Sequence, residues 1–370
     1  MADLYRDAGV DYDVLDVVKQ MAVTTAAASA GSLEGSGMSE LAGARGTTAY
    51  VLETGDEQLG IVMEGLGTKA LLAQEYLDAT GEDHFAAIAI DAVAAIVNDL
   101  VSVGALPVTV LAYFATGDAN WYADVDRSRS LLEGWAEGCR LAGASWGGGE
   151  SPALPGVVVP GALELAGCAL GKVPKGRRAV LGDRIAAGDE IVFVASSGLH
   201  ANGASLARHI VDSTELSWSQ RLSDGKTLGE ALLTPTHIYA PFVRALHERD
   251  AWPKYLNPIT GHGLVKVMRS AAEVRYVIED LPAVPEALRI LTDAAGMDER
   301  DAYSTLNMGV GMVVIVEPGG GRAIVEAAES VGLPALVAGH VEDGRRSVDV
   351  RPLGVVYEGA ESHLPQSGAR

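Results

Sequence analysis

The longest apolar stretch in the chain covers residues 85–115, and three polar residues, Asp91, Asn98 and Asp99, interrupt it. Its hydrophobic pattern predicts a buried helix followed by a strand. On such a helix, positions 91 and 98 lie about two turns apart and share one face, with position 99 at its edge. Carboxylates are seldom buried without a partner. This face could therefore hold a metal ion, or its acids could meet water and cap neighbouring elements.

The rest of the chain alternates helical and extended patterns, which favours α/β or α+β layers in both halves. Helices are expected over 68–80, 85–103, 124–142, 204–211, 236–249, 285–295 and 322–331, and strands over 59–63, 108–115, 163–173, 190–195, 274–278 and 310–316. Segment 24–46 is rich in Ala, Gly, Ser and Thr, which predicts a long mobile loop. The last ten or so residues are expected to be disordered.

Length and composition predict two domains. A chain of 370 residues exceeds the size at which single hydrophobic cores usually stop growing. A polar, basic connector with Pro and several Gly residues predicts a linker over 174–189, with an N-terminal domain over 1–173 and a C-terminal domain over 190–370. Hydrophobic residues make up 48% and aromatic residues 5%, so the core must consist of Ala, Val, Leu and Ile, as suits an α/β protein.

Charge and cysteine content exclude several classes of function. A formal net charge of −21 argues against binding to nucleic acid or anionic membranes. The polar residues inside 85–115 argue against a membrane span. Neither Cys139 nor Cys168 lies in a Cys-x-x-Cys motif, and the first residues lack the pattern of a signal peptide. We therefore expect a reduced, cytoplasmic protein without a thiol mechanism.

The run Glu64-Gly65-Leu66-Gly67-Thr68-Lys69 lies between a predicted strand and a predicted helix. Glycines let backbone amides approach a phosphate, and a helix N-terminus adds partial positive charge. Thr68 can donate a hydrogen bond, and Lys69 supplies a full charge. The alternative is a tight turn. The preceding Glu64 favours a phosphate site, because a carboxylate there is useful when a metal bridges it to phosphates.

A second glycine cluster, Gly147-Gly148-Gly149, is followed by Glu150. It could be a surface hairpin, or a loop that brings its carboxylate to a shared metal. In the second case Glu64, Asp91, Asp99 and Glu150 would form an oxygen-only shell suited to Mg²⁺.

In the second half, the run from Ser196 to Gly203 connects a predicted strand to a predicted helix. Its small hydroxyls, glycines, Asn202 and His200 are typical of a site for a small molecule or a phosphate. His200 could transfer a proton or bind an anion, although an isolated loop histidine is often inert. Loops 260–263 and 307–311 could form other walls of the same cleft, or be simple turns.

Taken in order, these motifs resemble the aminoimidazole ribonucleotide synthetases, the phosphoribosylformylglycinamidine cyclo-ligases of purine synthesis. No single motif is decisive, but so many in one order are specific. The matching segments are 5–11, 65–69, 90–91, 97–100, 104–107, 113–117, 136–139, 148–150, 196–203, 233–236, 238–239 and 307–312.

The resemblance implies ATP, Mg²⁺, a nucleotide substrate and a homodimer. It also implies two α/β domains, with the N-terminal sheets pairing across the dimer. In that family's reaction, ATP activates an amide oxygen as a phosphate, and an internal amine then closes the imidazole ring. By position, the resemblance implies catalytic roles for Lys69, Asp91 and His200. It places Gly65, Gly67, Thr68, Lys69, Asn98, Gly148 and Gly149 around ATP; Glu64, Asp91, Asp99 and Glu150 around the metal; and Ser197, His200, Asn202 and Gly203 around the substrate.

Several departures from the family pattern keep alternatives open. The family usually has Asp-Gly-Val-Gly-Thr-Lys, where this chain has Glu64 and Leu66. The family's glycine-rich N-terminal loop is reduced to segment 35–38, one carboxylate is lost after Glu150, and His262 replaces a glycine. The alternatives are a related ATP-dependent kinase or dehydrating enzyme acting on another substrate, or a nucleotide-binding protein without catalysis. A selenophosphate synthetase is disfavoured, because no cysteine precedes Cys139.

Overall fold

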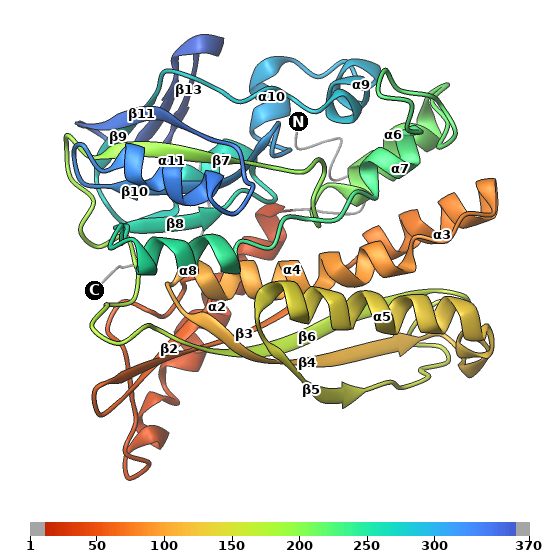
Figure 1. Ribbon diagram of the computed structural model, residues 1–370, viewed down its shortest axis with the longest axis horizontal. Helices are drawn as coiled ribbons and strands as arrows, with labels where there is room; N and C mark the ends of the chain where they lie inside the picture. The colour runs from red at the N-terminus through yellow and green to blue at the C-terminus, as the bar shows by residue number, and fades with distance from the viewer. Residues whose placement is uncertain (1–11, 360–370) are drawn as a thin grey trace.

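Within the described residues 12–359 of this computed structural model, the chain forms two mixed sheets with helices packed against them (Figure 1). The strand order of the first sheet is β1-β2-β3-β6-β4-β5. Its strands are β1 (Ser39–Glu40), β2 (Tyr50–Thr54), β3 (Glu57–Gly65), β4 (Leu106–Thr116), β5 (Ser145–Glu150) and β6 (Leu163–Lys172). Neighbouring strands are antiparallel except β4 and β5, which are parallel.

Helices cover one face of this sheet. Helix α4 packs against β3, β4 and β6, and α5 packs against α4 (Figure 1). The helices of this half are α2 (Tyr12–Ala27), α3 (Lys69–Thr80), α4 (Phe85–Ser102) and α5 (Val125–Ala142), with 3-10 turns η1 (Ala30–Leu33) and η2 (Ala119–Ala123). By length and composition α4 could cross a membrane, but 72% of it is buried inside the structure. The apolar stretch is therefore a core helix, as its polar residues predict.

The second sheet is also mostly antiparallel, with the strand order β13-β12-β9-β11-β7-β10-β8. Its strands are β7 (Glu190–Ala195), β8 (Tyr255–Pro258), β9 (Val274–Ile278), β10 (Val310–Val316), β11 (Ala335–Asp343), β12 (Ser347–Val350) and β13 (Val355–Glu358). Every residue of β10 is buried, which explains its unbroken apolar run.

Short helices surround this second sheet, and α11 packs on β7, β10 and β11. The helices are α6 (Ala204–Ser213), α7 (Leu228–Leu232), α8 (Ala240–Glu248), α9 (Glu286–Ala294), α10 (Glu299–Tyr303) and α11 (Gly321–Glu329), with 3-10 turns η3 (Gly263–Arg269) and η4 (Arg351–Leu353).

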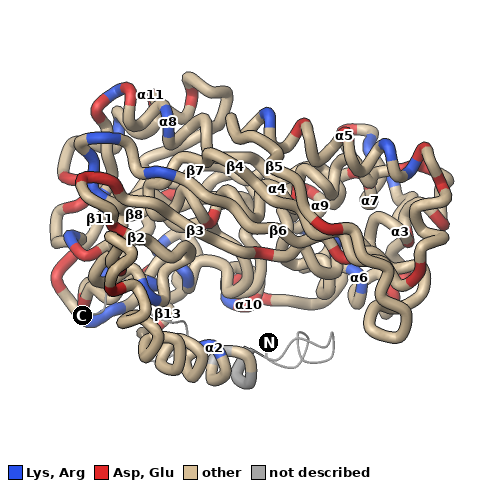
Figure 2. Tube along the Cα trace, turned by 90° about the horizontal axis from the view of Figure 1, so that it is seen from below, with Lys and Arg blue, Asp and Glu red and all other residues tan. Residues whose placement is uncertain are grey.

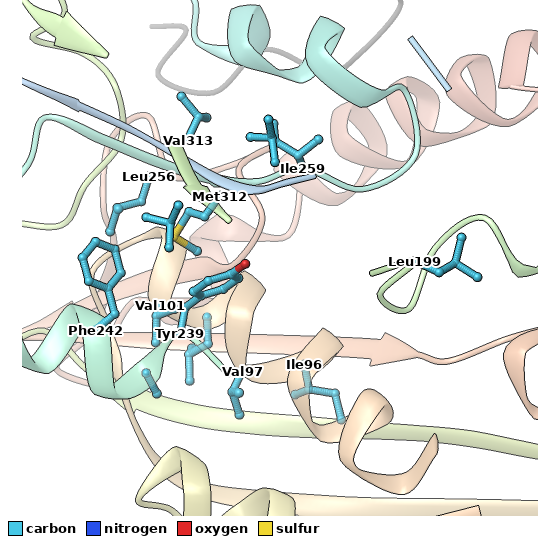
Figure 3. Packing of buried hydrophobic residues seen from close by; sticks show 14 of the residues in the cluster. Ile96, Val97, Val101, Leu199, Tyr239, Phe242, Leu256, Ile259, Met312 and Val313 are labelled. Carbon is cyan, nitrogen blue, oxygen red and sulfur yellow. The ribbon is translucent and has the colours of Figure 1, made fainter. Parts of the chain in front are cut away.

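The two halves share one hydrophobic core because α4 contacts elements of both. Figure 3 shows Val97 and Val101 of α4 close to Tyr239 and Phe242, with Met312 of β10 beyond them. All five side chains are buried. Helix α4 is therefore the element that positions the second half against the first.

The α/β fold class is confirmed, and the predicted helices and strands are present, but three expectations about local structure are wrong. Segment 24–46 is not one long loop, because α2 extends to Ala27 and is followed by η1 and β1. The helix expected from residue 236 begins at Ala240, because side chains of α4 hold the backbone of the preceding residues. The glycine cluster 147–149 belongs to strand β5. Segment 5–11 and the C-terminal ten residues lie outside the described residues.

Helix α5 crosses α4 at a glycine, which generates a stability prediction. A Cβ atom at Gly134 would lie 2.3 Å from the carbonyl oxygen of Ala86. Gly134→Ala should therefore destabilise the protein by about 1–3 kcal/mol through overpacking, although alanine favours helix. Urea unfolding measures this change. The control is Glu133→Ala on the exposed side of α5, which should change stability little; equal or higher stability of Gly134→Ala would contradict the close crossing.

Candidate functional site

A cavity of about 490 Å³ lies between the two halves and contains most of the polar groups that the sequence singles out. Loops of the second half and the inner ends of β3 and α4 form its walls. Its lining includes Lys19, Thr47, Thr48, Glu64, Gly65, Asn98, Asp99, His200, Asn202, Thr236, Tyr239, Thr260, His262, Lys266 and Arg269.

Beneath this cavity, Lys69 and Asp91 form an ion pair with no solvent-exposed side-chain surface. The Lys69 Nζ atom lies 2.7 Å from Asp91 Oδ2. It also donates a hydrogen bond to the carbonyl oxygen of His200 at 2.8 Å. Many Lys, Arg, Asp and Glu residues lie along the outer parts of the Cα trace (Figure 2), whereas both side chains of this pair are fully buried. A buried charge needs such a partner, because removing one member leaves the other unpaired at high cost.

The polar face of α4 holds the segment 234–239 of the second half. The Thr236 amide donates to Asp91 Oδ1 at 2.8 Å, and the Thr236 hydroxyl donates to the same oxygen. Asn98 lies about two turns further along α4. Its Nδ2 atom donates a hydrogen bond to the carbonyl oxygen of His237 at 2.8 Å, and its Oδ1 atom accepts one from the Tyr239 amide at 2.9 Å. Positions 91 and 98 thus share a face, as their spacing predicts, and both bind backbone of the second half.

The loop that contains His200 is held by its own side chains. His200 has a positive φ of 64°, and its Nε2 atom accepts a hydrogen bond from the Ser197 amide at 3.0 Å. The Ser197 hydroxyl donates to the carbonyl oxygen of Pro235 at 2.6 Å. Burial, with His237 and Lys69 nearby, holds the pKa of His200 well below its usual value. The imidazole is therefore neutral, with Nε2 as acceptor and its proton on Nδ1.

Asn202 lines the cavity, whereas Gly203 caps α6. Gly203 has a φ of 97°, and a Cβ atom there would lie 2.8 Å from Leu199 Cδ1. Only glycine fits this backbone position.

On the opposite wall, Glu64 and Asp99 lie near Lys266. Burial, together with the neighbouring Asp99 charge, raises the pKa of Glu64 to about 7, although Lys266 opposes this shift. Burial also raises the pKa of Asp99, whereas Lys266 opposes this shift. Burial lowers the pKa of Lys266 to about 8. The Lys266 ammonium donates a hydrogen bond to the Thr260 hydroxyl.

Two polar groups of the glycine loop before α3 form hydrogen bonds with other segments of the chain. The Gly67 amide donates to Glu164 Oε1 at 3.3 Å, and the Thr68 and Ser205 hydroxyls are 2.7 Å apart. Gly67 has a φ of 67°, which favours glycine.

Family models match both halves of the chain: "AIR synthase related protein, N-terminal domain" over residues 46–173 and "AIR synthase related protein, C-terminal domain" over 186–351. A phosphoribosylformylglycinamidine cyclo-ligase of Sorangium cellulosum is 39% identical, with 92% of this chain and 96% of the relative covered. One of Methanococcus maripaludis is 34% identical, with 92% of each covered. The chain belongs to the AIR synthase family. This confirms the resemblance that the motifs indicate.

Solved structures of other members of this fold agree with the architecture. A HypE–HypF complex matches with a TM-score of 0.59 and 19% identity, over 84% of this chain and 92% of that one. AaThiL complexed with AMPPCP and TMP matches with a TM-score of 0.56 and 15% identity, over 88% and 91%. At these identities the likeness concerns the fold.

The four acids predicted to share one metal do not meet in this AIR synthase chain. Glu64 and Asp99 both line the cavity, whereas Asp91 is paired with Lys69 beneath it. Glu150 lies in the edge strand β5, in the same cross-strand row as Gly65 but three strands away, about 14 Å at the usual spacing. Among residues 12–359, no group of three or more His, Cys, Asp or Glu side chains is placed to hold a metal.

The glycines expected near ATP are also divided. Gly65 lines the cavity, but Gly148 and Gly149 belong to β5, where Gly149 pairs with Ala112 of β4. A Cβ atom at Gly149 would lie 2.0 Å from the Ala112 carbonyl oxygen, so strand pairing explains this glycine. The roles predicted for these residues toward ATP stay predictions.

Sequence reasoning missed two parts of the site. In the sequence, Thr236 belongs only to a segment of the family resemblance and His237 to none, and no local pattern reveals that α4 binds their backbone. Lys266 had a usable signal, because it is a single basic residue in the apolar run 264–268, directly after a glycine loop. A lysine in such a run is either solvated or paired, and here it faces the cavity.

The raised pKa of Glu64 generates a pH prediction for the ligand-free protein. Its folded pKa of about 7 exceeds the usual 4.5, so the folded state binds the extra proton. The contribution of the Glu64 carboxyl group to the free energy of unfolding is fully present below about pH 4.5 and is lost as the pH rises through 7. Glu64→Gln should remove this loss, so thermal unfolding in EDTA should depend less on pH between 5 and 8. An unchanged pH profile would contradict the burial of this carboxyl group.

Proposed function

We propose that this protein is a phosphoribosylformylglycinamidine cyclo-ligase, which uses ATP to convert formylglycinamidine ribonucleotide into aminoimidazole ribonucleotide in the cytoplasm. The observation that carries the proposal is similarity over nearly the whole chain to curated cyclo-ligases at 33–39% identity. The cavity supports it, since about 490 Å³ falls within the range of roughly 300–1,000 Å³ typical of small-molecule sites.

In this reaction, transfer of the γ-phosphoryl group of ATP to an amide oxygen releases ADP and makes the amide carbon electrophilic. An internal amine then attacks that carbon, and the carbon–oxygen bond breaks as inorganic phosphate leaves. The protein's main contribution is to hold both nucleotides in reactive geometry and to exclude water. Asn202 and Thr260 line the cavity and offer hydrogen bonds to the substrates. The neutral His200 offers its Nδ1 proton to an oxygen or anion.

Two of the predicted metal ligands suit Mg²⁺. Glu64 and Asp99 face the same cavity, and burial raises the pKa of both carboxyl groups because it disfavours their charged forms. Mg²⁺ is usually bound by one or two carboxylates together with substrate phosphates. When bound, it would neutralise charge on the transferred phosphoryl group. Glu150 belongs to such a site only if another chain brings it there.

A cyclo-ligase assay tests the proposed function. The protein is given formylglycinamidine ribonucleotide, ATP and MgCl₂, and the expected product is an arylamine that diazotises, with release of ADP. EDTA should abolish turnover. Asp99→Asn should lower it at least about tenfold, because a charged contact contributes roughly 1.5–3 kcal/mol. The matched control is Asp126→Asn on the exposed face of α5, which should keep full activity. Absence of product from protein that binds ATP would refute the proposal.

The open face of the first sheet supports a homodimer. Helices α4 and α5 lie over one face (Figure 1), and the opposite face exposes Met63, Leu111 and Tyr113. Met63 is 78% exposed, and its row continues through Cys168 to Leu111. An exposed apolar sheet face of this kind marks an interaction surface. A second copy of the chain would cover it by packing sheet against sheet.

Met63→Asp should convert this dimer into a monomer at micromolar concentration, because a charge would be buried at the interface. Size-exclusion chromatography with light scattering measures the mass. Val337→Asp is the control, since Val337 is an exposed apolar residue of the second sheet. A monomeric wild-type protein, or a dimer that tolerates Met63→Asp, would disprove this interface.

A further inference from the structure

The loop Gly65–Lys69, here called the clamp loop, has the composition of a phosphate-binding loop, but its cation does not reach the cavity. The Lys69 side chain has no exposed surface, and Asp91 and the His200 carbonyl oxygen lie at 2.7 and 2.8 Å from its ammonium nitrogen. To contact a phosphate, Lys69 would have to leave Asp91 as an unpaired buried charge, which is strongly unfavourable.

Two further donors of the clamp loop, the Thr68 hydroxyl and the Gly67 amide, are engaged as well. The Thr68 hydroxyl bonds Ser205 in the first turn of α6. The Gly67 amide faces the carboxylate of Glu164, an acceptor that would repel a phosphate at the same position. Two of these three contacts, those of Lys69 and Thr68, cross from the first half of the chain to the second. The clamp loop therefore joins the two halves at the base of the cavity.

The opposite wall of the cavity carries a different lysine. Lys266 lies in η3 and lines the cavity, and its hydrogen bond goes to the neutral hydroxyl of Thr260. A ligand phosphate can replace a neutral hydroxyl as partner of an ammonium group, and the resulting charge-assisted hydrogen bond is stronger. Glu64 and Asp99 lie beside it, so a ligand held there would also meet the carboxylates that suit Mg²⁺.

We propose that Lys266, and not Lys69, is the lysine that binds phosphate in this cavity. Lys266 binds the phosphate chain of the nucleotide, whereas Lys69, paired with Asp91, positions the His200 loop and segment 234–239. This assignment rests on the proposed use of ATP, and it makes Lys69 a positioning residue with no contact to phosphate. Asp91 has the same role, because its second oxygen holds Thr236.

Two sets of variants separate these roles. Lys69→Met/Asp91→Asn removes both buried charges and keeps an oxygen that can accept from Thr236. Lys266→Met removes the cation beside Glu64 and Asp99, and Lys266→Arg restores a positive charge there. The control is Lys172→Met, which removes a partly exposed lysine paired with Glu57 at the ends of the neighbouring strands β6 and β3.

Hydrogen exchange without ligand tests the positioning role. The double variant should exchange faster in segments 196–205 and 233–239, whereas Lys266→Met and Lys172→Met should match the wild type there. Unchanged hydrogen exchange of these segments in the double variant would overturn the positioning role of Lys69 and Asp91.

Calorimetry with MgATP and steady-state kinetics test the phosphate role. Lys266→Met should weaken ATP binding by roughly tenfold or more and raise the KM for ATP, and Lys266→Arg should recover most of the affinity. The double variant should mainly lower kcat, with a smaller change in affinity for ATP.

Normal ATP binding by Lys266→Met would overturn the assignment. So would a loss of ATP affinity in the double variant equal to that of Lys266→Met, without faster hydrogen exchange. ATP binding by the wild type is measured first. If the wild type does not bind ATP, both the proposed function and the phosphate role of Lys266 are refuted. Hydrogen exchange would still test the positioning role of Lys69 and Asp91.

Discussion

The buried ion pair between Lys69 and Asp91 is the interaction on which the arrangement of the two halves depends. It joins the start of α3 to the middle of α4, and each partner also binds backbone of the second half. Two charges in a protein interior are stable only when they satisfy each other and their remaining hydrogen-bonding capacity. That requirement fixes the relative positions of four segments more narrowly than apolar packing could.

Helix α4 extends the same constraint along its length. Its apolar positions enter the core of both halves, and its polar positions, Asp91 and Asn98, accept amides from segment 234–239. Apolar contact is tolerant of small displacements, whereas these hydrogen bonds require defined distances. The walls of the cavity come from both halves of the chain, and these bonds hold the walls in fixed positions relative to each other. Such fixed positions suit a reaction between two bound molecules.

The cavity concentrates charge in a chain with a net charge of −21. Glu64, Asp99 and Lys266 lie close together there, and burial shifts the pKa of each toward its neutral form. This arrangement supports the proposed binding of nucleotide phosphates together with a divalent cation. Charge at the periphery does not contribute to this arrangement, because solvent screens it.

Local pattern predicted most elements because helical and strand periodicities reflect burial of one face. It failed where tertiary contacts replaced local preference. Glycine cluster 147–149 looked like a loop, yet pairing with β4 extends it as a strand that needs glycine for close approach. The start of α8 is delayed because α4 captures the residues before it.

By itself, the sequence determined that Asp91 and Asn98 share a helical face inside an apolar core, since helical spacing is a local property. Only the tertiary structure decided what that face binds. Asp91 meets Lys69, Asp99 turns toward Glu64, and Glu150 lies strands away. Those placements depend on strand order and on the packing of separate elements against one another, which no local spacing encodes.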